Sequence, residues 1–441
     1  MRSSTRGRLP LALVAVLLAF GLTGTANATG RVDNPYAGAR VYVNPEWSAR
    51  AAAEPGGAAV ADQPTAVWLD SMATVHGSNG RMGLRDHLDE ALRQGADLVQ
   101  VVLYDIPGRD CGRLSSNGEL AFDQLPTYRA EFVDPIAEVL RDPAYAGLRV
   151  VAVVEPNSLP FMVTHVPPSS EWTSLCEQVR ASDAYHQAIG YALARLGAIP
   201  NVYSYLDVGH HGNLGWDDYR AAFVQVLARA AGTAGSTFAD VHGFVANTSN
   251  YSVLDEVHLT KTSVGGRPIL QSRWVDWNPF IDELSYAEAL RLELVAAGFD
   301  PGVGVVVDTS RNGWGGPNRP TRANDATFDV DTYVNSGRLD RRLWIYNWCN
   351  QVGAGLGERP VASPVPGVDA YAWVKPPGES DGASSPLPYP GENHNRMCDP
   401  NYNSWPGASY RPTGAWPNTP PAGQWHSAGF RELLANAHPP L

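Results

Sequence analysis

The sequence predicts an α/β fold, a distorted parallel β/α barrel of seven or eight strands, with long loops forming a cleft or tunnel at the C-terminal ends of the strands. Three observations support this prediction. Short β-branched runs alternate with helical patterns from about residue 65 onward. Carboxylates and other polar residues follow directly after most of these runs. Two long segments without periodicity are rich in Gly, Pro, Asn and Trp.

The predicted strands are short runs of β-branched and aromatic residues bounded by turn residues. In chain order they are Ala66–Leu69, Leu98–Tyr104, Arg149–Glu155, Val202–Leu206, Val241–Ala246, Ile269–Ser272, Val303–Val307 and Ala370–Val374. The run at Ile269–Ser272 has the weakest pattern, so the predicted number is seven or eight.

The predicted helices have apolar residues on one face, at a spacing of three or four. Three such sets are Leu84, Leu88, Ala91 and Leu92; Phe132, Ile136, Val139 and Leu140; and Tyr219, Phe223, Val226 and Leu227. Ser285 with Glu288 is typical of a capping box that opens a further helix, and Phe430–Ala437 predicts a closing helix. The two aperiodic segments, Arg311–Asn347 and Pro376–Trp425, contain too many aromatic residues for disorder, which favours ordered loops.

The N-terminus has the pattern of a secretory signal peptide. Arginines precede the apolar run Leu9–Phe20, and small residues end it at Ala26-Asn27-Ala28. We therefore expect residues 1–28 to be removed, residues 29–441 to form a single domain, and the protein to be secreted and extracellular. No other segment approaches the roughly eighteen consecutive apolar residues of a membrane span, so no membrane partner is expected.

Charge and cysteine content narrow the choice of partners. The net charge of −12 and the lack of a basic cluster argue against nucleic acid, whose affinity depends on phosphate neutralisation. A neutral partner and a monomeric state are expected. Cys111, Cys176, Cys349 and Cys398 lack CxxC spacing, and in an exported chain they predict two disulfides with three possible pairings.

In a β/α barrel, functional residues gather at the C-terminal ends of the strands. The polar residues at these positions are Asp70, Asp105, Asp110, Glu155, Asn157, Asp207, His210, His211, Asn247, Asp308, Lys375, Glu379 and Asp381. An Asp at any one of these strand ends could instead cap the next helix. A metal site at Asp207, His210 and His211 is disfavoured, because no third His or carboxylate lies at ligand spacing.

Thirteen tryptophans are a high number for this chain length. Trp47, Trp216, Trp314, Trp348 and Trp373 lie in the same loops or strand ends as the carboxylates, although about half are expected to fill the core. Flat aromatic faces beside acids indicate glycoside chemistry. That chemistry needs one protonated carboxyl and one carboxylate, and Asp110 and Asp381 are the obvious candidates.

Several motifs resemble those of glycoside hydrolase family 6. The first signature of that family is similar to Val102-Leu103-Tyr104-Asp105-Ile106-Pro107-Gly108-Arg109-Asp110-Cys111-Gly112 with Ser115-Ser116-Asn117-Gly118. Further agreement is found at Tyr205-Leu206-Asp207, at Asn347-Trp348-Cys349-Asn350 and at Trp373-Val374-Lys375-Pro376-Pro377-Gly378-Glu379-Ser380-Asp381-Gly382. The resemblance runs from about residue 34 to the C-terminus.

The segment Asp308–Pro320 and the long loops resemble the bacterial cellobiohydrolases of this family. The resemblance implies exo action on β-1,4-glucan from the non-reducing end, with inversion, release of cellobiose and a tunnel over the substrate. It implies no cofactor and no metal. No separate carbohydrate-binding module is apparent.

The resemblance also assigns roles by position. Asp110 resembles the carboxylate that raises the pKa of the acid and orients water through Ser116, Tyr104 the tyrosine near the distorted sugar, and Asp381 the proposed base. The residues that resemble substrate-binding positions are Trp47, Asp207, Trp216, Asn247, Trp348, Lys375 and Glu379. The family disulfides would pair Cys111 with Cys176 and Cys349 with Cys398.

Three departures from the family pattern fall in the expected cleft. Asn157 in Glu155-Pro156-Asn157 replaces the general-acid Asp, Asn213 replaces a sugar-stacking Trp, and Trp344-Ile345-Tyr346 replaces a His-Pro-Gly-like turn. Asn cannot donate the proton that a general acid supplies. Two hypotheses follow: an exo-β-1,4-glucanase weakened at Asn157, or a catalytically inactive β-glucan-binding protein on the same fold.

Overall fold

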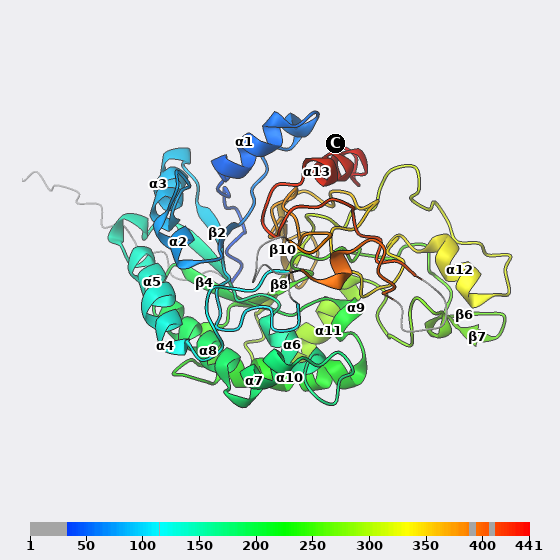
Figure 1. Ribbon diagram of the computed structural model, residues 1–441, viewed down its shortest axis with the longest axis horizontal. Coiled ribbons are helices and arrows are strands. Elements are labelled where there is room, and N and C mark those ends of the chain that lie inside the picture. Colours follow the sequence, from blue (N-terminus) through cyan, green and yellow to red (C-terminus); the bar gives the residue numbers. More distant parts are fainter. Residues whose placement is uncertain (1–32, 114, 388–393, 405–410) are drawn as a thin grey trace, which may run out of the picture.

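The structure is a computed structural model that describes residues 33–113, 115–387, 394–404 and 411–441. The predicted signal peptide, residues 1–28, lies outside the described residues. An eight-stranded sheet with the order β1-β2-β3-β4-β5-β8-β10-β9 forms the centre of the molecule (Figure 1). Helices curve around one side of this sheet, and the loops coloured yellow to red gather on the other.

Neighbouring strands from β1 to β10 pair in parallel, and β9 adds an antiparallel edge. The strands of this sheet are β1 (Val67–Leu69), β2 (Leu98–Leu103), β3 (Arg149–Val154), β4 (Val202–Asp207), β5 (Gly243–Ala246), β8 (Gly304–Asp308), β9 (Val361–Ala362) and β10 (Val368–Ala372). The sheet curls so far that Thr65 forms an isolated parallel bridge with Trp373, next to β1 and β10. The predicted distorted parallel barrel is confirmed.

The predicted strand at Ile269–Ser272 is wrong. Residues Ile269–Gln271 form a short 3₁₀ turn after a small hairpin of β6 (Ser263–Val264) and β7 (Arg267–Pro268). The Ile269 side chain is buried in a loop cluster with Leu259 and Trp274, so its apolar character is satisfied without a place in the barrel.

The helices follow the predicted apolar faces. They are α1 (Pro45–Ala53), α2 (Met72–His76), α3 (Leu84–Gln94), α4 (Leu125–Thr127), a π-helical turn (Tyr128–Val133), α5 (Asp134–Leu140), α6 (Ser158–Thr164), α7 (Ser174–Ala181), α8 (Ala184–Gly197), α9 (His211–Leu214), α10 (Asp217–Ala231), α11 (Glu283–Ala296), α12 (Val330–Gly337) and α13 (Ser427–Ala435). The predicted capping box at Ser285 is wrong, because Asp282 caps α11 by accepting the Ser285 N–H at 3.0 Å. Among the described residues, no helix has the length and apolar character required to cross a membrane.

Both faces of the parallel strands are buried, as expected for a sheet inside a ring of helices. In β2, Val99, Val101 and Leu103 pack in the cluster that the sheet shares with the helices. The alternate residues Leu98 and Val102 pack inside the barrel. This alternation fixes the register of the strands, and it orients the polar residues that follow them.

Two disulfides tie loops at the C-terminal ends of the strands to neighbouring segments. Cys111, after β2, is bonded to Cys176 in α7, and Cys349 is bonded to Cys398 in the last long loop. Both pairings implied by the family resemblance are confirmed. The described parts of the two long aperiodic segments hold well-defined structure, including α12.

Candidate active site

A cavity of about 310 Å³ opens where β1, β2, β3 and β10 end. Most of the predicted site residues line it together. These are Tyr104, Asp110, Ser116, Asn157, Trp348, Lys375, Glu379 and Asp381. The cavity also exposes Trp68, Asp70 and Arg113, so it combines carboxylates, cations and flat aromatic rings.

Asp110 is fixed by two hydroxyl groups. The Tyr104 hydroxyl donates to Asp110 Oδ2 at 2.7 Å, and the Ser116 hydroxyl donates to the same oxygen. Asp110 adopts a left-handed backbone conformation (φ 53°), which is uncommon for a residue with a side chain and occurs often at functional turns. Burial, and then the charge of Asp110, raise the pKa of Tyr104, so the phenol remains a donor. Asp110 is thereby held as an ordered acceptor on the cavity wall.

Asn157 lies at the turn between β3 and α6. Its backbone is left-handed (φ 66°), and its N–H donates to Asp207 Oδ2 at 2.9 Å. Its side chain lines the cavity and is 9 % exposed. An amide can donate a hydrogen bond at this position, but it has no proton to transfer near neutral pH.

Glu155 and Asp207 position this turn from behind. Glu155 is buried, and its two carboxylate oxygens accept the N–H groups of Asp105 and Ile106 at 3.2 and 3.1 Å. Burial raises the pKa of Glu155 to about 7 and that of Asp207 to about 6. Asp207 was predicted to bind substrate, but in this structure its contact with the site is through the Asn157 backbone.

Asp381 is already engaged by several donors. Arg311 Nη1 lies 2.9 Å from both of its carboxylate oxygens. Asp381 Oδ2 also accepts the Tyr251 hydroxyl at 2.9 Å and the Asn350 N–H at 2.8 Å. The Asp381 side chain is only 7 % exposed, so the carboxylate lies in the wall as part of a buried ion pair.

Lys375 and Glu379 form another part of the wall. Lys375 Nζ lies 3.4 Å from Glu379 Oε2 and 5.0 Å from the centre of the Trp68 ring. Burial raises the pKa of Glu379, and the charge of Lys375 opposes this shift. Trp68 was missed in the sequence, although it lies between Val67 and Leu69, which pack toward the helices, so alternation alone predicts that it faces inward.

Two predicted sugar-binding tryptophans do not line this cavity. Trp47 is 3 % exposed, donates its indole N–H to the Pro377 carbonyl at 2.8 Å and packs edge-on against Trp373. Trp216 is stacked in parallel on Tyr346, with ring centres 5.5 Å apart. Trp47 therefore belongs to the core between α1 and α13, and one face of Trp216 is covered.

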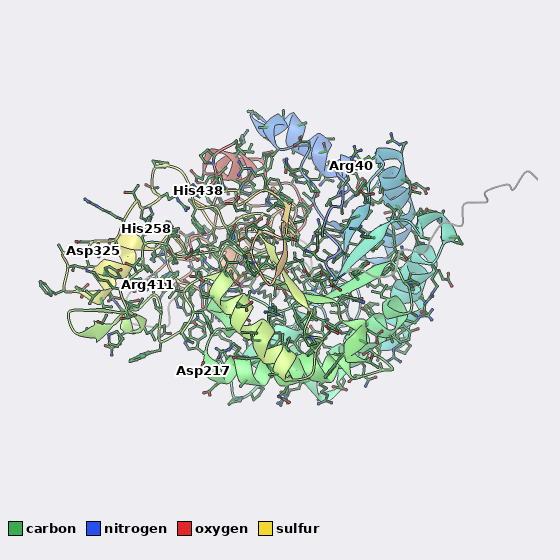
Figure 2. The ribbon with its side chains drawn as sticks, turned by 180° about the vertical axis from the view of Figure 1, so that it is seen from behind. Arg40, Asp217, His258, Asp325, Arg411 and His438 are labelled. Atoms are coloured by element: carbon green, nitrogen blue, oxygen red, sulfur yellow. A yellow bond between two sulfur atoms is a disulfide. The ribbon has the colours of Figure 1, made fainter. Side chains whose placement is uncertain are left out.

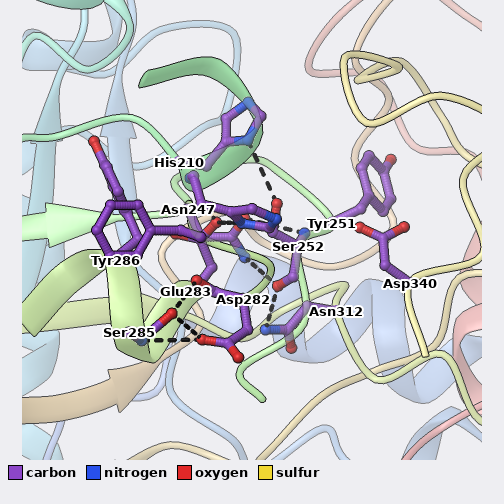
Figure 3. Close-up of polar contacts among 12 residues, drawn as sticks. His210, Asn247, Tyr251, Ser252, Asp282, Glu283, Ser285, Tyr286, Asn312 and Asp340 are labelled. Atoms are coloured by element: carbon purple, nitrogen blue, oxygen red, sulfur yellow. Dashed lines mark hydrogen bonds and ion pairs between the residues drawn. The ribbon is translucent and has the colours of Figure 1, made fainter. Parts of the chain in front are cut away.

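The Asn247 side chain bonds to backbone groups and does not line the cavity (Figure 3). It is fully buried, and its amide group donates to the Asp308 carbonyl at 2.8 Å. Its side-chain oxygen accepts the Ser252 N–H at 3.2 Å. Its amide therefore joins two strand-end loops, and its contact with substrate stays a prediction.

The two neighbouring histidines serve separate purposes. His210 Nδ1 lies 3.4 Å from the Ser252 hydroxyl (Figure 3), whereas His211 Nδ1 lies 2.6 Å from Glu283 Oε1 in a fully buried pair. Within the described part of the chain, no three His, Cys, Asp or Glu side chains are arranged to hold a metal ion.

Comparison with known proteins agrees with this geometry. Residues 29–437 match the family model of glycosyl hydrolases family 6. Exoglucanase A of Cellulomonas fimi is 45 % identical over 442 residues, which cover 95 % of this chain and 50 % of that protein. Exoglucanase 3 of Agaricus bisporus is 33 % identical over 421 residues, covering 92 % of this chain and 80 % of that one. The chain thus spans half the length of the Cellulomonas fimi exoglucanase.

Solved structures give the same result. The catalytic domain of Cellulomonas fimi Cel6B superposes with a TM-score of 0.88 at 43 % identity, covering 94 % of this chain and 97 % of that one. Cellobiohydrolase II (Cel6A) of Humicola insolens, in complex with glucose and cellotetraose, gives a TM-score of 0.70 at 29 % identity, covering 92 % and 100 %. The sequence match over nearly the whole chain and the shared fold establish that this protein belongs to family 6 of the glycosyl hydrolases.

Proposed function

We propose that this protein is a secreted exo-acting β-1,4-glucanase that degrades cellulose, and that Asn157 weakens its turnover. One observation carries the proposal: the cavity keeps Asp110, ordered by Tyr104 and Ser116, while an amide occupies the position of the proton donor. The names of the relatives, an exoglucanase and a cellobiohydrolase, support the substrate class.

In the proposed inverting reaction, a water molecule attacks the anomeric carbon as the bond to the leaving oxygen breaks. Ser116 and Asp110 are suited to hold that water, because the serine hydroxyl donates to the carboxylate and its oxygen can accept from water. Asp381 carries the second negative charge of the site, but Arg311, Tyr251 and Asn350 occupy its oxygens. We infer that it takes up the proton through intervening water.

Asn157 can only hydrogen-bond the leaving oxygen. The missing proton must then come from solvent, and loss of a general acid costs about 10²- to 10⁴-fold in rate. The effect should depend on the leaving group, because a good leaving group departs without protonation.

The disulfide-bonded loops support exo action. Cys349 follows Trp348 on the cavity wall, and its bond to Cys398 fixes the last long loop near Asp381. Loops held in this way suit a tunnel that admits one chain end and releases cellobiose.

A second candidate function is β-glucan binding without hydrolysis. The observation that favours it is the rebuilt region beside Asn213, in which Ile345 packs so closely on α9 that a Cβ added to Gly212 would lie 2.6 Å from Ile345 Cγ1. Trp344 and Tyr346 flank this contact, with ring centres 4.6 Å apart. Asn213, in the same short helix, has no aromatic face on which a sugar could stack.

Turnover of two substrates by the unmodified protein separates these functions. We expect measurable hydrolysis of β-cellobiosyl fluoride, whose leaving group needs little acid assistance, and much slower hydrolysis of cellotetraose. Binding of cellotetraose without turnover of either substrate would favour the glucan-binding protein. If the protein neither binds cellotetraose nor hydrolyses either substrate, both functions are contradicted.

A further inference from the structure

Arg113 is the cavity cation that the proposed reaction does not use. The other two cations on the wall are engaged: Lys375 pairs with Glu379, and Arg109 donates to the carbonyls of Asp70 and Ser116 at 2.6 and 2.9 Å. Among the described residues, the Arg113 guanidinium has no hydrogen-bond or ion-pair partner within contact distance.

The guanidinium is nonetheless held in a defined place. It lies over the Trp348 ring, 4.3 Å from the ring centre, and 5.5 Å from the centre of the Phe161 ring. Its backbone N–H donates to the Asp110 carbonyl at 2.8 Å, so it shares a turn with the ordered carboxylate. Stacking covers the face of a guanidinium and leaves the in-plane N–H groups available.

Arg113 is buried, and no carboxylate of the described residues is in direct contact with its guanidinium. Burial lowers the pKa of Arg113, which means that its surroundings disfavour the uncompensated cation. The charges of Asp110, Asp381 and Asp207 oppose this shift, and each of these carboxylates already accepts a hydrogen bond from another group. Asn157, on the same wall, supplies no charge.

We propose that Arg113 is a specificity-determining residue that makes this cavity prefer β-1,4-glucan chains carrying a carboxylate. A carboxylate matches a guanidinium through two parallel N–H···O bonds, and the contact with Trp348 holds the guanidinium on the cavity wall. The inference rests on the proposed function, because it takes glucan as the ligand of the cavity. The carboxylate has two chemical sources: a C6-oxidised (glucuronate) unit within the chain, or an aldonate at an oxidised chain end.

Calorimetric titration with three ligands tests the proposal: cellotetraose, cellotetraose with one C6-oxidised unit, and cellotetraonic acid. We expect at least one acidic ligand to bind the unmodified protein about tenfold more tightly than cellotetraose, with a preference that falls as salt increases. Which acidic ligand binds more tightly identifies the source of the carboxylate.

Variants then assign the preference to the guanidinium. Arg113→Ala should bind cellotetraose and the acidic ligands alike, and Arg113→Lys, which keeps the charge without the paired donors, should keep part of the preference. Arg40→Ala removes the same charge from an exposed side chain beside the C-terminal end of α3, away from the cavity (Figure 2), and should leave the preference intact.

Three results would overturn the proposal. One is equal binding of neutral and acidic ligands by the unmodified protein, and another is a preference that survives in both Arg113 variants. If no oligosaccharide binds, the proposed function fails and this inference fails with it. Normal binding of cellotetraose without an acidic preference overturns only the role of Arg113. Thermal melting of each variant shows that it is folded.

Discussion

Single side chains decide what the cavity can do, and Asn157 and Asp381 have the largest influence. The Asn157 side chain has nearly the shape of Asp but no proton to transfer. Its left-handed backbone suits Asn and Asp better than other residues with side chains. Asp381 keeps its charge, but its value to the reaction depends on a buried partner, Arg311. The two residues therefore call for different tests.

Asn157→Asp should raise hydrolysis of cellotetraose by at least about tenfold, because it restores a proton donor without changing the backbone. The charges of Asp110 and the nearby Asp207 should raise the pKa of the new carboxyl and keep it protonated. Product release is measured by chromatography, with β-cellobiosyl fluoride as the control. Equal gains on both substrates would contradict the assignment of position 157 as the acid.

Asp110→Asn should abolish the remaining hydrolysis and leave cellotetraose affinity within about tenfold, because the amide still accepts from Tyr104 or Ser116. Initial rates and calorimetric titration measure the two effects. Unchanged turnover would mean that the reaction takes place elsewhere in the cleft.

Asp381→Ala should also abolish turnover, and in addition lower the free energy of unfolding by about 3–5 kcal/mol, because it leaves Arg311 charged and buried. The matched control is Asp325→Ala, which removes an exposed partner of Lys261 (Figure 2) and should cost no more than about 1 kcal/mol. Urea unfolding of both variants gives the comparison. A similar cost for both would show that the Arg311 pair contributes little.

At the scale of elements, the sequence predicted the strands and helices that have a regular apolar pattern. It did not predict features that depend on contacts with other elements. The parallel strands and the α3 and α10 faces were predictable, since alternation and helical spacing record burial directly. The cap of α11 was misassigned, because Asp282 competes with Ser285 for the same position. The burial of Trp47 depends on α13, which lies far away in sequence, and no local pattern carries that information.

Reduction of the disulfides should loosen the loops over the cavity before the barrel unfolds, because both bonds join loop segments at its mouth. Hydrogen exchange with and without reductant should show faster exchange near Cys111 and Cys349 while β2 and β3 remain protected. Simultaneous loss of protection in the strands would show that the disulfides support the core as well.

For the whole molecule, fold and family were predictable from the sequence, and much of the site was too. Residues after parallel strands must meet at one end of a barrel, which brought Asp110, Asn157 and Lys375 together as expected. Asn247 and Trp216 were assigned as substrate contacts from the family resemblance, and the sequence did not show that Asn247 bonds to the Asp308 carbonyl or that Tyr346 stacks on Trp216. The interior also contains carboxyl groups whose ionisation lowers the free energy of unfolding.

Stability should fall as pH rises from about 7.5 to 9. Burial raises the pKa of Glu155 to about 7, that of Glu256 to about 8 and that of Asp105 to about 9. In this range the folded chain holds protons on these groups that the unfolded chain has released, so the free energy of unfolding decreases with pH. Histidines whose pKa is lowered by burial, such as His87 and His210, hardly oppose this trend, because above about pH 7.5 they are neutral in the folded and the unfolded state.

Melting temperatures measured across this range test the trend. Glu256→Gln should reduce the slope, since the amide cannot ionise, whereas the surface variant Glu288→Gln should leave it unchanged. A stability that rises with pH from about 7.5 to 9 would contradict the raised pKa values of Glu256 and Asp105.

The join between β1 and β10 has a mechanical consequence. Two contacts connect these strands: the bridge between Thr65 and Trp373, and a hydrogen bond of 2.8 Å that the Trp68 indole N–H donates to the Val374 carbonyl. Trp68 and Lys375 stand on opposite sides of this join, and both line the cavity. A small widening of the barrel along this line would therefore widen the cavity directly, without any movement of the helices around the other strands.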